Sequence, residues 1–276
     1  MENTNTEKKT NSFWSILRIV LILILLGVII YEGVMIYFDQ KEYSVAISEY
    51  DNIADQYVIV KDDNSELFEK IDEDSEDEYP RLDINFEALK GINSDFIGWL
   101  YFPAISTINY PVVKEQSIDQ YLHKTFEGTP NKAGCIFMDV DSDADFCGLS
   151  DFLFGHNMRN GSMFGSLKTI YKNKDKDILA ENPYVYIYTE DKIYKYKVFS
   201  YYATTVGSYS YTEVKNESEY EDFVNYVKNC SMKEIPREVD FSEHPSLLTL
   251  STCSGQSGSG NRFVVHSVKV ASFDRQ

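Results

Sequence analysis

The chain has 276 residues, 43% of them hydrophobic, and a formal net charge of −18 at pH 7. This length and composition fit one sizeable folded domain with appendages and exclude disorder throughout the chain. The acidic balance also argues against nucleic acid as a partner, because binding phosphates requires Lys and Arg clustered on one face.

The segment 13–38 carries the clearest physical signal in the sequence. It is almost wholly apolar, broken only by Arg18 and Glu32, and it is long enough to cross a bilayer as a helix. No small-residue cleavage site follows the apolar run, which favours a retained anchor over a signal peptide that is removed. Basic residues precede the segment and an acidic region follows it. The positive-inside rule then predicts a single-pass protein of the cell membrane, with residues 1–12 in the cytoplasm and the folded part outside.

Residues 39–79 are expected to connect this anchor to the folded domain. Apolar residues recur at helical spacing over 40–60 and predict an amphipathic juxtamembrane helix. The run 62–78 is dense in acidic residues and predicts a solvated spacer or exposed helix face, with cation binding as the alternative. We expect the extracytoplasmic domain to span residues 80–276 and to begin with a short helix near 86–92.

From Phe96 onward the sequence consists of short β-favouring runs separated by Gly, Pro, Asn and Asp. Eight such runs predict a mainly β fold, a closed and mostly antiparallel barrel, because closure removes exposed strand edges. One amphipathic helix is expected between the sixth and seventh runs, around residues 220–230, with Cys230 on its apolar face. The eight runs are 98–102, 108–113, 134–138, 150–155, 184–189, 193–204, 246–252 and 263–270.

The acidic cluster 139–145 invites comparison with a calcium-binding loop. The EF-hand loop needs Gly at its sixth position and Glu at its twelfth, where this chain has Ala144 and Ser150. A polar surface loop is therefore favoured, with weak cation binding as the alternative, and no metal site is predicted. No cysteine spacing is diagnostic of a disulfide or a zinc site, so pairing stays open among Cys135, Cys147, Cys230 and Cys253.

A thiol and a cation are predicted at one strand edge near the C-terminus. The apolar run 246–252 ends at Cys253, and the next β-favouring run begins with Arg262. A cysteine that closes an apolar run is often a small buried hydrophobe. It becomes a nucleophile where a neighbouring histidine favours the thiolate. A free thiol outside the membrane counts in favour of this chemical role.

Of the four histidines, His156 is best placed to be that partner. It follows the apolar run 150–155 and precedes a polar loop, so a buried strand would deliver it to the end of the sheet, where side chains meet substrate. The other three histidines are expected to be structural, with His123 and His244 in loops and His266 in the last strand.

These residues also resemble a known family. The segment Thr249-Leu250-Ser251-Thr252-Cys253 fits the TLxTC signature of sortases, and Arg262 follows at the spacing of that family's essential arginine. The block 154–164, FGHNMRNGSMF, is similar to the histidine block of class B sortases. The blocks 96–100, 109–113 and 121–123 also resemble class B sequences. A helix before the seventh strand is a further trait of class B.

The resemblance implies a sortase-like eight-stranded barrel with N-terminal helices, in a membrane-anchored cysteine transpeptidase of a Gram-positive bacterium. Such an enzyme would cleave the C-terminal sorting motif of a secreted protein after Thr, form a thioester on Cys253, and transfer the protein to an amine of peptidoglycan or its lipid-linked precursor. His156 would act as acid and base, and Arg262 would stabilise the oxyanion. No metal or organic cofactor would be required. We expect further substrate contacts from Ser251, Thr252, Asn157 and Tyr211.

One stretch departs from the class B pattern. Class B sequences commonly carry an acidic residue directly after the cysteine, whereas this chain continues with the Ser/Gly-rich loop 254–260. A flexible, uncharged loop cannot make the substrate contact of that acidic residue. Two alternatives stay open: a cysteine endopeptidase that releases surface proteins with the same residues, and a non-enzymatic, anchored wall-binding module in which Cys253 belongs to the core.

Overall fold

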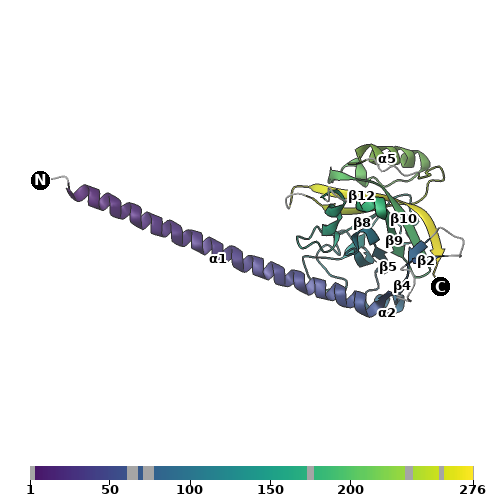
Figure 1. The fold of residues 1–276 in the computed structure, drawn as a ribbon, viewed down its shortest axis with the longest axis horizontal. Coiled ribbons are helices and arrows are strands. Elements are labelled where there is room, and N and C mark those ends of the chain that lie inside the picture. The colour runs from purple at the N-terminus through teal and green to yellow at the C-terminus, as the bar shows by residue number, and fades with distance from the viewer. Residues whose placement is uncertain are drawn as a thin grey trace. The chain divides into compact units, whose positions relative to one another are not determined.

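The computed structural model describes residues 4–60, 68–70, 78–172, 177–233, 239–254 and 258–275. The chain divides into two compact units, Met1–Val45 and Ala46–Gln276. Figure 1 shows the long first helix and the barrel that forms most of the second unit.

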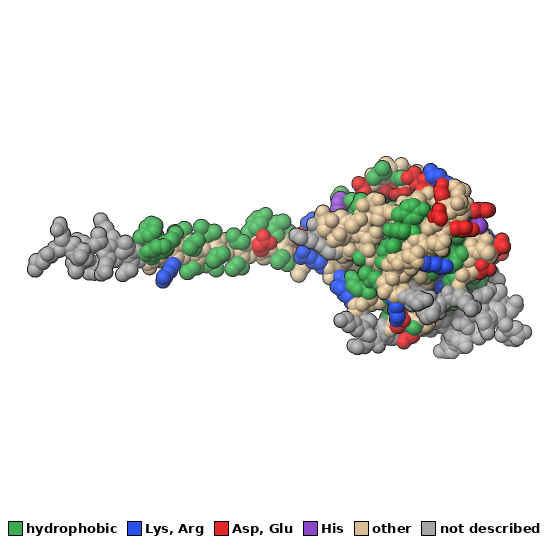
Figure 2. All heavy atoms as spheres, turned by 90° about the horizontal axis from the view of Figure 1, so that it is seen from above, with side chains coloured by type: hydrophobic (Ala, Val, Ile, Leu, Met, Phe, Trp, Pro, Cys, Tyr) green, Lys and Arg blue, Asp and Glu red, His purple; other side chains and the backbone are tan. Residues whose placement is uncertain are grey.

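The first helix, α1 (Thr4–Tyr57), is continuous over 54 residues. The sequence predicts an anchor at 13–38 and a separate juxtamembrane helix at 40–60, and the structure joins the two, because no proline interrupts the chain between them. From Phe13 the helix is long and apolar enough to cross a membrane, with a mean hydropathy of 2.8 and none of its apolar window buried. Figure 2 shows apolar side chains over most of the visible helix. Length and composition are therefore compatible with the predicted anchor.

Eight strands close into a barrel in the order β10-β12-β11-β8-β7-β6-β5-β9, which confirms the predicted fold class. Six of the eight neighbouring pairs are antiparallel, while β6–β7 and β8–β11 are parallel. The strands are β5 (Phe96–Tyr101), β6 (Asn109–Lys114), β7 (Ile136–Met138), β8 (Asp151–Phe154), β9 (Tyr184–Tyr188), β10 (Lys192–Thr205), β11 (Leu247–Cys253) and β12 (Asn261–Asp274).

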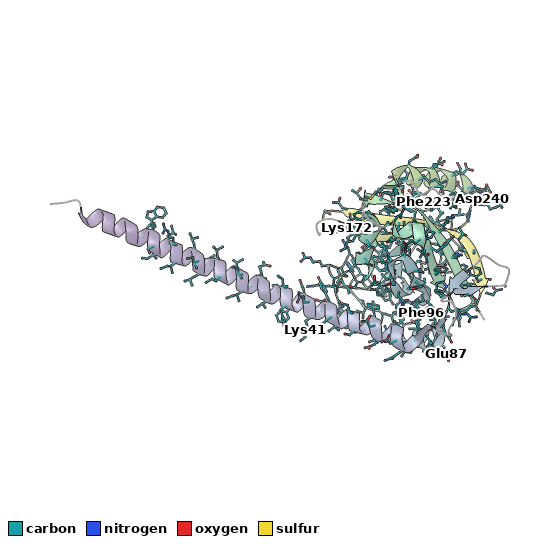
Figure 3. The ribbon with its side chains drawn as sticks, in the orientation of Figure 1. Lys41, Glu87, Phe96, Lys172, Phe223 and Asp240 are labelled. Atoms are coloured by element: carbon teal, nitrogen blue, oxygen red, sulfur yellow. The ribbon has the colours of Figure 1, made fainter. Side chains whose placement is uncertain are left out.

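The predicted inserted helix is α5 (Glu217–Cys230), which lies between β10 and β11 in the chain. Its start is capped by Asn216, whose side chain accepts a hydrogen bond from the backbone N–H of Glu219 at 3.0 Å. Its buried face packs against the barrel through residues that include Phe223, while Cys230 is only half-buried at the edge of this cluster. Phe223 and Phe96, labelled in Figure 3, belong to α5 and β5 and are both buried.

Short elements complete the second unit. Most of the acidic run 62–78 lies outside the described residues, so the predicted spacer or exposed helix face stays a prediction there; its described residues 68–70 form the strand β2, which pairs antiparallel with β3 at 78–80. The predicted helix at 86–92 is present as α2. The remaining elements are β1 (Val58–Val60), β2 (Phe68–Lys70), β3 (Glu78–Pro80), β4 (Leu82–Ile84), α2 (Phe86–Ile92), α3 (Thr169–Lys172), α4 (Ile178–Glu181), and the 3-10 helices η1 (Pro103–Ile105), η2 (Phe164–Lys168) and η3 (Tyr209–Tyr211).

The end of α1 belongs to the barrel unit. The hydroxyl of Tyr50 donates to the carbonyl oxygen of Gly134 at 2.6 Å, and Glu49 Oε1 accepts from the backbone N–H of Glu127 at 3.0 Å. Beyond the helix, β1 pairs with β4. The compact unit therefore begins at Ala46, well before the predicted boundary at residue 80.

All four cysteines are free thiols. Cys135 is buried, Cys230 is half-buried, and Cys147 and Cys253 are exposed. The loop 139–145 is irregular, as predicted, and the ammonium of Lys114 donates to two of its backbone carbonyl groups. Within the described ranges, no cluster of three or more His, Cys, Asp or Glu side chains has a geometry that could hold a metal ion.

Candidate active site

The parallel pair β8–β11 brings two of the predicted catalytic residues to one end of the barrel. Ser251 is the register partner of Phe154, and the backbone N–H of Gly155 donates to the Ser251 carbonyl oxygen at 3.2 Å. His156 and Cys253 each lie two positions beyond the Phe154–Ser251 pair. Because parallel strands run in the same direction, both residues lie at the same end of this strand pair.

Arg262 is brought to the same edge by the antiparallel pair β11–β12, in which it is the register partner of Cys253. The Cys253 side chain is exposed and that of Arg262 is half-buried, with Nη1 donating to the Asn261 carbonyl oxygen at 3.0 Å. Of the Ser/Gly-rich loop between them, residues 255–257 lie outside the described residues. The three predicted catalytic side chains are thus gathered by one set of adjacent strands.

His156 is held closely by its surroundings. A Cβ atom on the preceding residue, Gly155, would lie 2.5 Å from Ile136 Cδ1 and 2.8 Å from the ring of Phe164, so only glycine allows this approach. His156 Nε2 lies 2.6 Å from the carbonyl oxygen of Leu122. A carbonyl oxygen only accepts hydrogen bonds, so Nε2 carries a hydrogen and the neutral ring has Nδ1 as its basic nitrogen.

Burial lowers the pKa of His156 below its ordinary value of 6.5. The neighbouring His123 and Arg262 act in the same direction, because a second positive charge near the ring is unfavourable, while the hydrogen bond to the Leu122 carbonyl opposes them. His156 is therefore neutral near pH 7 and is able to accept a proton.

The structure shows the surroundings of three of the four predicted substrate contacts. Ser251 is fully buried, and its Oγ lies 2.8 Å from the hydroxyl of Tyr211. Thr252 is also buried, and the described residues offer its Oγ1 no hydrogen-bond partner. Neighbouring residues of a strand point to opposite faces, so the two side chains are buried on different sides of β11, and substrate contact by either stays a prediction. Asn157 is half-buried and forms a β-bridge with Met163.

Tyr211 lines a pocket of about 340 Å³ beside the candidate site. Its ring stacks on that of Phe154 with centroids 6.2 Å apart, and burial raises the pKa of its hydroxyl. Arg262 also lines the pocket, so the pocket adjoins the predicted oxyanion contact. Other lining residues are Phe152, Asp139, Asp141 and Glu213. The pocket therefore combines aromatic side chains, carboxylates and one guanidinium.

The other histidines behave as predicted with one exception. His266 is buried, with Nδ1 2.9 Å from Thr249 Oγ1, and burial lowers its pKa to about 3. His244 contacts the ring of Tyr220 edge-on. His123 lies in a loop, as predicted, but its ring stacks on that of His156. No local pattern signals this contact, because the two residues belong to separate loops.

Comparisons with known proteins agree with this geometry. A family model described as a sortase domain matches residues 100–270. Sortase B of Listeria monocytogenes is 30% identical over 235 residues, which cover 84% of this chain and 88% of that protein. Sortase B of Staphylococcus aureus is 32% identical over 173 residues, which cover 61% of this chain and 67% of that protein.

Solved structures give the same result. The structure of Bacillus anthracis sortase B in complex with AAEK1 matches with a TM-score of 0.64 and 29% identity, over 85% of this chain and 99% of that one. Clostridium perfringens sortase B matches with a TM-score of 0.61 and 28% identity, over 68% of this chain and 100% of that one.

The family match covers more than half of the chain and includes His156, Cys253 and Arg262. It sets aside the alternative of a non-enzymatic wall-binding module. The chain belongs to the sortase family, in its class B branch, and is a sortase-type cysteine transpeptidase.

Proposed function

We propose that this transpeptidase cleaves the C-terminal sorting motif of secreted proteins after Thr and transfers them to an amine of peptidoglycan or its lipid-linked precursor. Cys253 is the nucleophile, His156 the acid and base, and Arg262 the oxyanion contact. The observation that supports this assignment is the pairing of β8 and β12 with β11, since Cys253 pairs with Arg262 and His156 lies two residues beyond the Phe154–Ser251 pair.

His156 carries one proton in each half of the reaction. His156 accepts the Cys253 thiol proton while the sulfur attacks the Thr carbonyl carbon, and the guanidinium of Arg262 donates to the developing oxyanion. The C–N bond then breaks, and the leaving amine takes the proton from His156. The incoming amine attacks the thioester, gives a proton to His156 and releases the thiol, which takes that proton back. The enzyme thus ends unchanged, and in the substrate one amide bond has been exchanged for another.

Mass spectrometry of the full-length protein in detergent tests the covalent step. Incubation with a library of motif peptides should add an acyl fragment to Cys253, and an added amine should release it as a transpeptidation product. Cys253→Ala should abolish both the adduct and the product. The matched control is Cys147→Ala, which removes the other exposed thiol and should leave both intact. An adduct on another residue, or full activity of Cys253→Ala, would contradict the assignment.

Hydrolysis is the competing outcome, because water also attacks a thioester. A cysteine endopeptidase would give the same free acid with or without an added amine. Transpeptidation predicts that the amide product grows with amine concentration at the expense of the free acid. The ratio of the two products therefore separates the two functions.

Anchoring by α1 places the reaction outside the cytoplasmic membrane. The support is the long, apolar and unburied stretch of that helix together with the basic residues before it. A membrane-impermeant maleimide added to intact cells should label Cys147, which is exposed. Labelling only after lysis would show the opposite orientation.

A further inference from the structure

The stacked pair of histidines points to a residue that prepares the site without reacting. The rings of His123 and His156 lie with centroids 5.5 Å apart and planes inclined by 20°. His123 is exposed, so core packing does not account for its position. The preceding residue, Leu122, accepts the hydrogen bond of His156 Nε2 at 2.6 Å. Two consecutive residues thus contact the edge and the face of one imidazole ring.

The 121–135 loop, which carries Leu122 and His123, is held in place by hydrogen bonds. Tyr121 is buried, and its hydroxyl donates to Asp95 Oδ2 at 2.8 Å. The carbonyl oxygen of His123 accepts from the backbone N–H of Asn131 at 3.0 Å. A loop fixed in this way offers His156 a defined surface, because its residues have little freedom to follow the ring.

Gly134 closes the loop behind the Leu122 carbonyl group. Its φ is +61°, and a Cβ atom there would lie 2.5 Å from the Leu122 carbonyl oxygen, so the position requires glycine. The Gly134 carbonyl oxygen in turn accepts from the Tyr50 hydroxyl at 2.6 Å. The place of the acceptor for His156 is therefore set by backbone packing that does not involve His156 itself.

We propose that His123 is a positioning residue for His156: with the Leu122 carbonyl group it holds the imidazole in one orientation, with Nε2 protonated and Nδ1 left to exchange protons at Cys253. This inference rests on the proposed function, since it presumes an acid–base role for His156. The hydrogen bond fixes the tautomer, and the stacked ring fixes the tilt and keeps water from one face.

The titratable and charged groups that act on His156 come from two elements. His123 comes from the 121–135 loop and Arg262 from β12. Burial, His123 and Arg262 all lower the pKa of His156. Removing the His123 side chain would admit water to one face of the ring and remove one neighbouring charge. Both changes raise the pKa of His156.

A titration of the full-length protein in detergent micelles tests this directly. The Cys253→Ala background prevents turnover. NMR spectra of protein with isotope-labelled histidine, recorded over a range of pH, give one imidazole signal for each of the four histidines. We expect His123→Ala to raise the pKa of His156. His123→Phe keeps a stacked ring but carries no charge, so it should raise this pKa by less.

Kinetics of the active protein give a second readout. His123→Ala should lower kcat about tenfold and leave KM within about twofold, because misorientation of the acid–base group affects the chemical step. His123→Phe should restore kcat to within about threefold of the wild type, because stacking is retained. His244→Asn, which changes a histidine that packs on Tyr220, is the control and should alter neither quantity.

An unchanged His156 titration together with an unchanged kcat in His123→Ala would overturn the positioning role and leave the Cys253 chemistry standing. Full activity of Cys253→Ala would instead remove the proposed function. Thermal melting checks that each variant is folded. If His123→Ala is unfolded, His123→Gln replaces it with the same expected and contradicting results, since it also lacks the ring.

Discussion

At the residue scale, burial decides the protonation state of the candidate base. The pKa of His156 is lowered from 6.5, chiefly by burial, so the neutral ring persists to lower pH than in a free histidine. With His156 as the proposed base, activity should require this neutral form and be lost as pH falls through the lowered pKa. We therefore expect the acidic limb of the kcat/KM profile below pH 6.5. A limb above that value would mean that another group controls the acid side.

The half-buried guanidinium of Arg262 should not be replaceable by an ammonium group. Arg262→Ala removes the proposed oxyanion contact and should reduce kcat/KM at least about a hundredfold. Arg262→Lys keeps the charge but loses the planar pair of donors, so it should still cost about tenfold. Equal rates for the wild type and Arg262→Lys would show that charge alone suffices.

Asp151 is a fully buried carboxylate near the start of β8. Its Oδ1 accepts from the backbone N–H of Asp143 at 2.8 Å, while its Oδ2 has no hydrogen-bond partner among the described residues. Burial raises its pKa from 3.8 to about 6. An acid with a raised folded pKa binds its proton more tightly in the folded state, so stability falls as pH rises from 3.8 to about 6.

Asp151→Asn should remove this pH dependence. The substituted amide can still accept from the Asp143 N–H and carries no charge to desolvate. The wild type should lose at most about 3 kcal/mol between these pH values, since one pKa unit corresponds to about 1.4 kcal/mol. Urea unfolding at pH 4 and pH 7 measures the difference. If the free energy of unfolding changed with pH equally in the two proteins, groups other than Asp151 would be responsible for the change.

At the element scale, the candidate site depends on which strands pair with one another more than on where each strand lies in the sequence. Hydrophobic alternation and turn residues located the eight strands to within a few residues of their observed bounds. They did not indicate that β8 runs parallel to β11, because pairing depends on contacts between distant segments. That pairing explains why Ser251 and Thr252 are enclosed while Cys253 at the strand end is exposed.

The end of α1 is joined to the barrel unit by hydrogen bonds. The Tyr50 hydroxyl donates to the Gly134 carbonyl oxygen and accepts from the Phe126 N–H at 3.3 Å. Tyr50→Phe should lower the free energy of unfolding by about 1–2 kcal/mol, because two buried backbone groups lose a partner. Tyr43→Phe, in the first unit, is the matched control. Equal stability of Tyr50→Phe and the wild type would show that water replaces the hydroxyl.

At the scale of the whole molecule, the boundary of the folded unit has a practical consequence. A fragment 46–276 keeps the buried Tyr50 and Ile53 and the β1–β4 pair, whereas a fragment 80–276 lacks all three. We expect the longer fragment to melt at a clearly higher temperature, because two buried apolar side chains contribute roughly 1.5–3 kcal/mol each. Equal melting temperatures would place the stable core within residues 80–276.

Residue patterns within single segments were enough to predict the strands, α5 and the long apolar helix, because these elements depend on periodicity or composition within each segment. The sequence also singled out Cys253, Arg262 and His156, because short motifs and strand ends mark them. Tertiary structure alone decided that the end of α1 joins the barrel unit and that His123 stacks on His156. Such contacts join residues far apart in the chain, as the hydrogen bond across 34 positions at His156 shows, and no local pattern encodes them.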